Sequence, residues 1–200
     1  MKKAENKKMV AGLCNVQKPE DFARELKRMY ERVVEETEKE IAYEEIIKML
    51  LDTQKEDGAW NRLDSYRIDG DARVEFGYVP TYHACATLIY VILKRPDLVD
   101  SAVRAALKNG LEFSTGRSLQ GHGFDAMAGE QYALQVFEQA GIYECFCRYP
   151  QETSTFCEMW TNKLQSMEKA YHEGRTIYDW NVDYAELMKK RLELWKTARL

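Results

Sequence analysis

Acidic side chains gather in residues 61–79, a stretch of the chain that lacks a helical pattern. Asp69 and Asp71 flank a glycine there. Paired carboxylates can perform acid–base chemistry on a sugar or hold a divalent cation, because both tasks need two oxygen-bearing groups close together. The alternative is a solvated loop in which Arg67 and Arg73 form ion pairs with these carboxylates.

A histidine in a second irregular stretch is the next candidate. His122 stands between two glycines, and Asp125 follows three positions later. The glycines let a ligand approach the backbone, and a nearby carboxylate can orient an imidazole. We therefore expect His122, Asp125, Asp69 and Asp71 to be candidate catalytic residues. The alternative for His122 is a histidine exposed on a turn.

Aromatic residues border the first acidic stretch and are candidates for ligand binding. Their rings could line a cavity for a flat apolar or a carbohydrate ligand. The alternative is that they belong to the core, since aromatic residues near a helix start commonly do. The candidates are Tyr66, Phe76, Tyr78 and Tyr82, with His83 directly after them.

Possible metal ligands do not form a complete set. His83 and Cys85 are two positions apart and would lie about 200° from each other around a helix, so they cannot easily hold one metal ion. Cys145 and Cys147 lack a second pair, and Cys157 alone does not complete a tetrahedral site. We predict no metal site and no cofactor.

Hydrophobic periodicity predicts the elements that position these residues. Apolar residues recur at spacings of three and four along most of the chain, whereas no alternating run is long enough to indicate a sheet. We expect an all-α fold of about seven helices. Their expected ranges are 20–34, 37–51 after a capping box at Thr37 and Glu40, 80–93, 96–113, 127–140, 155–173 after a capping box at Thr155 and Glu158, and 180–198.

One of the predicted helices, 80–93, is apolar nearly all round, so we expect it to be buried on several sides. The exit of the helix before it carries the pattern Gln-x-x-x-Gly-x-Trp, formed by Gln54, Gly58 and Trp60. A glycine after an aspartate turns the chain, since glycine accepts positive φ without steric cost. We expect Trp60 to fold back over the helix end and the Gln54 amide to bond the backbone of a neighbouring helix.

This pattern resembles the QW repeat of the squalene cyclase and protein prenyltransferase superfamily, whose members build an α/α toroid from helical hairpins. Residues 116–124 resemble a degenerate second copy, with Phe124 in the place of Trp60. A complete toroid needs on the order of 300 residues. The resemblance therefore implies a partial toroid-like or solenoid arrangement, two copies that complete a cavity together as a homodimer, or a compact bundle of another kind.

The superfamily offers two chemical templates that this chain matches only in part. Its cyclases use an Asp-x-Asp-Asp cluster, which Asp69-Gly70-Asp71 approaches without the adjacent aspartate. Its prenyltransferases hold zinc with an Asp-x-Cys pair and a histidine, which His83-Ala84-Cys85 approaches without the aspartate.

Composition limits the function further. The net charge of −4 and the pI near 5.6 argue against nucleic acid as a partner. No apolar span approaches the roughly 20 residues that cross a bilayer, and an odd number of cysteines without a paired framework favours a cytoplasmic protein. We expect residues 1–18 to be a flexible segment and residues 19–200 to form a single helical domain.

Two functions fit these observations. The first is a helical protein that binds or processes an isoprenoid-like or carbohydrate-like ligand between the two irregular stretches. The second is a non-catalytic scaffold that binds a protein partner. A binding protein should bring the candidate residues to one concavity with aromatic walls, whereas a scaffold should show an exposed apolar patch.

Overall fold

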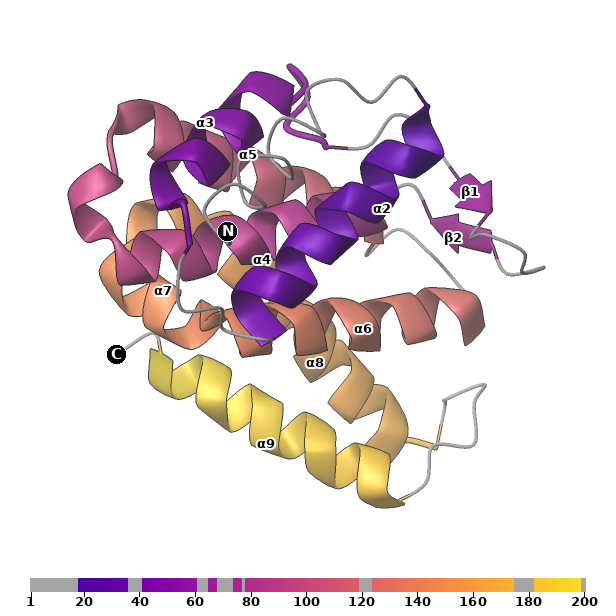
Figure 1. Ribbon diagram of the computed structural model, residues 1–200. Coiled ribbons are helices and arrows are strands. Elements are labelled where there is room, and N and C mark those ends of the chain that lie inside the picture. Colours follow the sequence, from indigo (N-terminus) through magenta and orange to yellow (C-terminus); the bar gives the residue numbers. More distant parts are fainter. Residues whose placement is uncertain are drawn as a thin grey trace.

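The structure of the chain is a computed structural model that describes residues 18–35, 41–60, 65–67, 74–76, 78–118, 124–174 and 182–198. The fold is all-α, as predicted, apart from one short β-hairpin (Figure 1). The expected flexible segment lies outside these residues except for Lys18. The described elements are α2 (Pro19–Tyr30), a π-helical turn (Glu31–Glu35), α3 (Tyr43–Thr53), β1 (Ser65–Arg67), β2 (Val74–Phe76), α4 (Val79–Lys94), a 3₁₀ turn (Pro96–Leu98), α5 (Ser101–Ser118), α6 (Phe124–Ala140), α7 (Ile142–Arg148), α8 (Pro150–His172) and α9 (Val182–Ala198).

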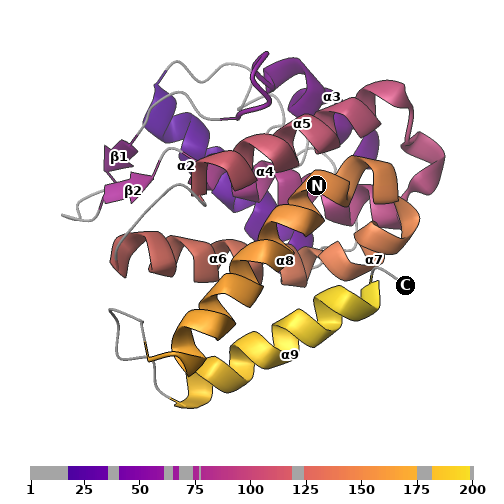
Figure 2. The ribbon, with the colours of Figure 1, turned by 180° about the vertical axis from the view of Figure 1, so that it is seen from behind.

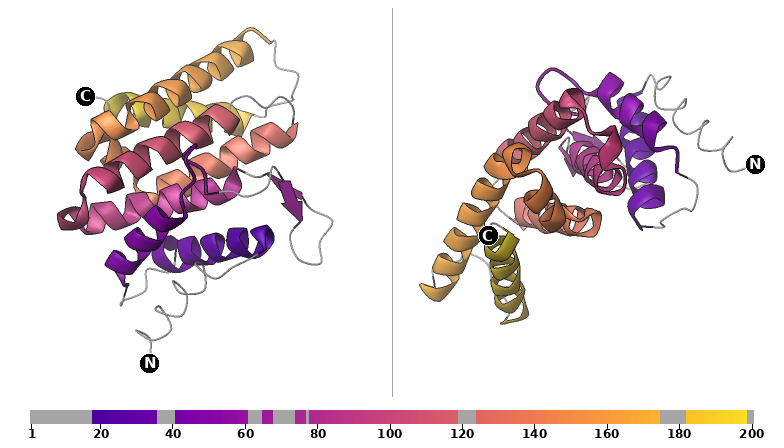
Figure 3. Two further views of the ribbon diagram at one scale, coloured as in Figure 1. Left: turned by 90° about the horizontal axis from the view of Figure 1, so that it is seen from above. Right: turned by 90° about the vertical axis from the view of Figure 1, so that its left-hand side faces the viewer.

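Helix α4 lies at the centre of the bundle. Its sequence is apolar on all sides, and thirteen of its sixteen residues are buried. It packs against α2, α3, α5, α6 and α7. Figure 3 shows α2 and α3 on one side of it and α8 and α9 on the other. A central helix with five neighbours corresponds to the compact-bundle alternative, and a toroid-like order of hairpins stays a prediction.

Helices α8 and α9 cover the side of the bundle opposite to α2 and α3 (Figure 2). Trp160 of α8 and Trp195 of α9 are buried, with ring centroids 6.4 Å apart. Arg191 of α9 forms an ion pair with Glu138 of α6, with Nε and Oε1 3.0 Å apart. This paired charge and the aromatic rings hold α9 against α6 and α8.

Several predicted helix boundaries were wrong. Pro96–Leu98 forms a separate 3₁₀ turn, because Val99 after it is extended, and α5 begins only at Ser101. α5 then continues past Phe113 to Ser118, so Gly116 is helical and not part of a turn. The helix predicted from Thr37 is described from Tyr43, and residues 36–40 lie outside the described part of the chain.

The predicted connection at residues 143–150 is a helix, α7. Gly141, with φ at +93°, separates α7 from α6. Tyr149 breaks the helical conformation, and Pro150, whose fixed φ suits a first helical position, begins α8. Thr155 therefore lies inside α8 and does not cap its start. The extra helix raises the expected seven to eight among the described residues.

The irregular stretch at residues 61–79 contains the β-hairpin, which the sequence analysis did not predict. β1 and β2 are antiparallel, with Tyr66 opposite Glu75. The hairpin lies at the edge of the molecule next to the start of α4, not beneath the helices (Figure 1). Strands of three residues are too short for an alternating pattern to show.

The expected contacts of Gln54 and Trp60 are confirmed. Trp60 is fully buried, and its indole Nε1 donates to the carbonyl oxygen of Leu50 at 2.8 Å, in the last turn of α3. The Gln54 amide nitrogen donates to the carbonyl oxygens of Gly58, at 3.0 Å, and of Ala106 in α5, at 2.9 Å. The turn therefore joins α3 to α5.

Two glycines make room for this turn. Gly58 has φ at +87°, and a Cβ atom there would lie 2.4 Å from the Asn109 carbonyl oxygen. A Cβ atom at Gly110 of α5 would lie 2.5 Å from Cζ3 of the Trp60 ring. The Trp60 backbone N–H also donates to Thr81 Oγ1 of α4 at 3.0 Å. We call Gln54, Gly58 and Trp60 the α3 turn.

The second copy of this pattern lies mostly outside the described residues. Residues 119–123 are not described, and Phe124 is the first residue of α6, with its side chain outside the description. The repeat stays a prediction.

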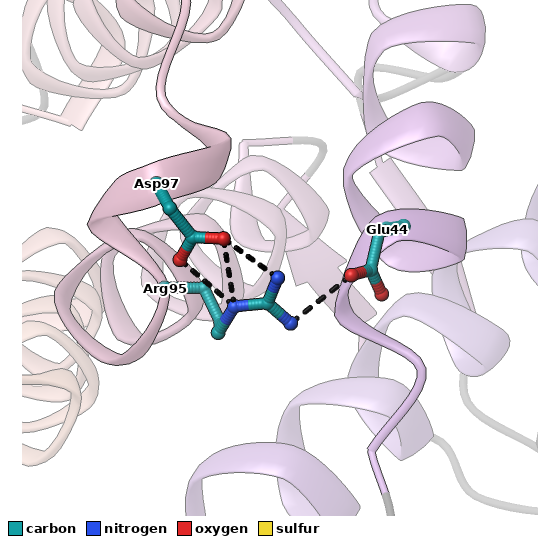
Figure 4. A network of polar contacts seen from close by, with 3 residues as sticks. All are labelled: Glu44, Arg95 and Asp97. Atoms are coloured by element: carbon teal, nitrogen blue, oxygen red, sulfur yellow. Dashed lines mark hydrogen bonds and ion pairs between the residues drawn. The ribbon is translucent and has the colours of Figure 1, made fainter.

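An arginine holds the other end of α3. Arg95, directly after α4, donates from Nη2 to Asp97 Oδ2 at 2.7 Å, and its Nη1 lies 3.0 Å from Glu44 Oε1 in the first turn of α3 (Figure 4). Its guanidinium also lies over the Tyr43 ring, 6.0 Å from the centroid. Exposed ion pairs add little to the free energy of unfolding. Because both carboxylates are exposed, we expect these contacts to position α3 rather than to stabilise the protein.

Two glycines of α5 give a matched test of the α3 turn. Gly110→Ala should destabilise the protein by about 1–3 kcal/mol, because the new methyl group overlaps the Trp60 ring. Gly116→Ala on the same helix meets no atom within 4 Å and should be neutral or stabilising by about 0.5–1 kcal/mol. Urea unfolding measures both changes. Equal effects of the two substitutions would contradict the packing described.

Replacement of the indole tests the contribution of Trp60. Trp60→Ala should cost roughly 3–5 kcal/mol, since it removes a fully buried ring. Trp60→Phe should cost less but more than zero, because the hydrogen bond from the indole to the Leu50 carbonyl is lost while most of the buried ring is kept. Both free energies of unfolding can be measured by chemical denaturation, and a near-neutral Trp60→Ala would remove the residue from this role.

Candidate functional site

Helices α2, α4 and α6 each contribute one ring side chain to a shared contact. Tyr30 comes from α2, His83 from α4 and Tyr132 from α6. The His83 Nε2 atom lies 2.7 Å from the Tyr132 hydroxyl, and the two rings meet edge to face at 5.8 Å between centroids. The Tyr30 ring lies 5.3 Å from the His83 ring, centroid to centroid, at 32°. We call Tyr30, His83 and Tyr132 the ring junction.

Tyr30 is held in place by its own hydroxyl and by an unusual helix end. It is the last residue of α2, and the π-helical turn Glu31–Glu35 follows directly. Such turns are rare and are frequent at functional sites. The Tyr30 hydroxyl donates to the Gln139 side-chain oxygen of α6. α2 and α6 are therefore tied together where they meet His83.

One nitrogen of His83 has no hydrogen-bond partner. The side chain is only 2% exposed, yet Nδ1 meets neither donor nor acceptor in the described structure. A neutral imidazole carries its proton on one nitrogen, so Nδ1 is left as either an unused donor or an unused acceptor. A buried polar group of this kind costs about 1–3 kcal/mol and is an exception in folded proteins.

Burial keeps the junction uncharged. Removal from water, together with the positive charge of Lys27, lowers the pKa of His83 to about 3. Burial also raises the pKa of Tyr30, and Glu35 nearby adds to the effect. At neutral pH the junction therefore holds a neutral imidazole and neutral phenols.

Two further predicted residues lie beside the junction. Tyr82 is 1% exposed, and its ring packs edge to face on Phe137 of α6 at 5.7 Å. Tyr78 is half-buried, and its ring lies 5.3 Å from that of Tyr82. The rings of Tyr78 and Tyr82 thus meet at the start of α4. Tyr82 belongs to the core, and a role of these residues in ligand binding stays a prediction.

The other predicted residues are not tested by the structure. His122, Asp69 and Asp71 lie outside the described residues. Asp125 is in the first turn of α6, Tyr66 is in β1 and Phe76 is in β2, but their side chains are outside the description. Whether they share a concavity with His83 stays a prediction.

The geometry separates His83 from Cys85. The imidazole faces Tyr132, whereas Cys85 Sγ would lie 2.7 Å from a Cβ atom at Gly110, on the side of α5. The two side chains therefore face different neighbours, as two positions apart on a helix requires. No group of three or more His, Cys, Asp or Glu residues among those described could hold a metal ion. Cys145 and Cys157 are buried, and Cys147 is exposed.

Sequence analysis did not find Tyr30, Tyr132 or Gln139 as site residues. Tyr30 counted as one residue of the apolar stripe of α2. Tyr132 and Gln139 lie on α6, 49 and 56 positions after His83, and no local spacing links them to it. Only the packing of α2 and α6 on α4 brings these residues together.

Comparison of the chain with protein-family models, with curated proteins and with solved structures gave no match. In the described part of the chain, none of the helices has the length and apolar character that a membrane span requires.

The buried neutral imidazole predicts a pH dependence of stability. The unfolded histidine has a pKa near 6.5, whereas the folded one takes up its proton only near pH 3. The contribution of the neutral His83 to the free energy of unfolding is therefore fully present above pH 6.5. It is lost as the pH falls from 6.5 toward 3, with a slope of up to about 1.4 kcal/mol per pH unit.

His83→Gln should flatten this slope, because glutamine does not titrate but can still bond the Tyr132 hydroxyl. Urea unfolding between pH 7 and pH 4 measures the slopes. An unchanged slope in His83→Gln would show that His83 is not buried as a neutral ring.

Proposed function

We propose that the protein binds a small organic molecule at the ring junction, of the isoprenoid-like or carbohydrate-like class that the sequence suggests. The observation that carries the proposal is a fully buried histidine that contacts rings from two neighbouring helices and has one nitrogen unused. Ligand sites in proteins typically combine such apolar walls with a few polar groups.

The chemistry of the junction supports binding more than acid–base catalysis. A general acid or base works best with a pKa near the operating pH, whereas the pKa of His83 is lowered to about 3. A neutral imidazole beside phenol rings can still donate or accept one hydrogen bond. It can also stack on a sugar face or an apolar chain.

The α3 turn supports the family resemblance only at the level of architecture. Gln54 and Trp60 tie the end of α3 to α5, which fits the joining of helices that the QW-type pattern implies. Asp69-Gly70-Asp71 still departs from the Asp-x-Asp-Asp cluster of the cyclases, and His83-Ala84-Cys85 still lacks the aspartate of the prenyltransferase zinc site. We therefore propose a binding function and assign no reaction.

The described residues show no surface that favours the scaffold alternative. A protein-binding scaffold should present a contiguous apolar patch. Among the described residues, Leu194 is the one large hydrophobic side chain that is exposed, at 43%. The buried thiols Cys85, Cys145 and Cys157 are consistent with the proposed cytoplasmic location.

Farnesol and maltose test the proposal as representatives of the two ligand classes. At least one should bind and raise the melting temperature. Tyr132→Trp should weaken that binding about tenfold or more, because the larger ring fills the junction. Tyr90→Trp is the matched control. Tyr90 is half-buried, as Tyr132 is, but it lies on α4 two turns after His83.

Native mass spectrometry measures the bound fraction and also reports the subunit number, which the partial α/α arrangement leads us to expect to be two. The proposal fails if neither probe binds, or if Tyr132→Trp binds as well as the unaltered protein.

A further inference from the structure

One ring nitrogen of His83 is engaged by a neighbouring side chain, and the other has no partner. Its Nε2 atom is engaged by the Tyr132 hydroxyl at 2.7 Å, and its backbone carbonyl accepts from the Thr87 hydroxyl at 2.8 Å. Tyr30 covers the ring at 5.3 Å between centroids. Only Nδ1 is without a partner in the described structure.

We infer that the ligand presents an uncharged hydroxyl group to His83 Nδ1, and that Tyr132 positions the imidazole by setting its tautomer. This inference rests on the proposed function and adds the chemical group that the site recognises. Sugars and isoprenoid alcohols both carry such a group.

A hydroxyl is the group that fits either state of the ring. If Tyr132 donates to Nε2, then Nδ1 carries the proton and needs an acceptor. If Nε2 donates to Tyr132, then Nδ1 is a lone pair and needs a donor. A hydroxyl oxygen accepts and its hydrogen donates, so it satisfies Nδ1 in both cases. A ketone or an ether would satisfy only the first.

Charged groups are disfavoured at this nitrogen. Nδ1 is sealed from solvent, and a charge placed there without a buried counter-charge would lose its hydration. Lys27 acts on His83 as a positive charge, which opposes an ammonium ligand. Lys27 is itself half-exposed and lies 3.8 Å from Glu31 Oε1, so it is poorly placed to neutralise a buried carboxylate.

The neighbouring side chains make the site rigid. Tyr30 cannot turn away from the imidazole without losing its bond to Gln139, and α6 carries both Gln139 and Tyr132. A rigid site loses little entropy on binding and discriminates sharply between similar groups. We therefore expect selection by charge among ligands of equal size.

Benzyl alcohol, benzoate and benzylamine test this selection, because they share one ring and differ in the charge of the polar group. The protein is labelled with ¹⁵N-histidine, and the chain has only three histidines to resolve. Benzyl alcohol should shift the His83 Nδ1 resonance in a saturable way. The two charged probes should bind with an affinity at least about tenfold lower. The His172 resonances should not move.

Two variants separate recognition from positioning. His83→Gln should remove the selective binding of benzyl alcohol. Tyr132→Phe should change the tautomer ratio of His83 before any probe is added, because Nε2 loses its partner; an unchanged ratio would remove Tyr132 from the positioning role.

The inference fails if benzoate or benzylamine binds as well as the alcohol, or if His83→Gln keeps the selectivity. If farnesol or maltose binds at the junction with no change at Nδ1, the proposed function stands and this inference falls. If benzyl alcohol gives no saturable shift up to its solubility limit, the inference also falls, and water is the partner of Nδ1.

Discussion

The hydrogen bond from the Trp60 indole to the Leu50 carbonyl fixes the part of the bundle on which the rest depends. The Leu50 carbonyl in the last turn of α3 accepts from the backbone N–H of Gln54 and also from the Trp60 indole, so the indole is tied to the end of the helix. Its ring then occupies space next to Gly110 of α5 that a Cβ atom would fill. Gln54 adds a bond to the Ala106 carbonyl of the same helix. A turn of seven residues thereby sets the distance between α3, α4 and α5.

Central placement of α4 imposes the second constraint. Its polar groups are removed from water, so each one needs a partner inside the protein. Thr81 accepts from the Trp60 backbone, and the Thr87 hydroxyl donates to the His83 carbonyl. His83 Nε2 meets the Tyr132 hydroxyl. The Nδ1 atom of His83 lacks such a partner, and this supports the proposal that a ligand supplies one.

Local spacing predicted the features that local spacing determines. The apolar character of residues 80–93 predicted a buried helix, and the Gln54 and Trp60 pattern predicted which groups they would contact. The same approach missed α7, because seven residues give too little periodicity for a helix to be recognised. It also missed the ring junction as a unit. Tyr30, His83 and Tyr132 are far apart in the chain, and only the packing of three helices makes them neighbours.

The α3 turn and the ring junction act on opposite sides of one helix. Thr81 and His83 are two positions apart, so their side chains point about 200° from each other around α4. Trp60 holds the Thr81 side, and Tyr132 holds the His83 side. A rotation of α4 that turned the imidazole toward another partner would break the bond between Trp60 and Thr81. The orientation of His83 is therefore set before any ligand arrives, and the energy that fixes it comes from the helix turn 23 residues earlier in the chain.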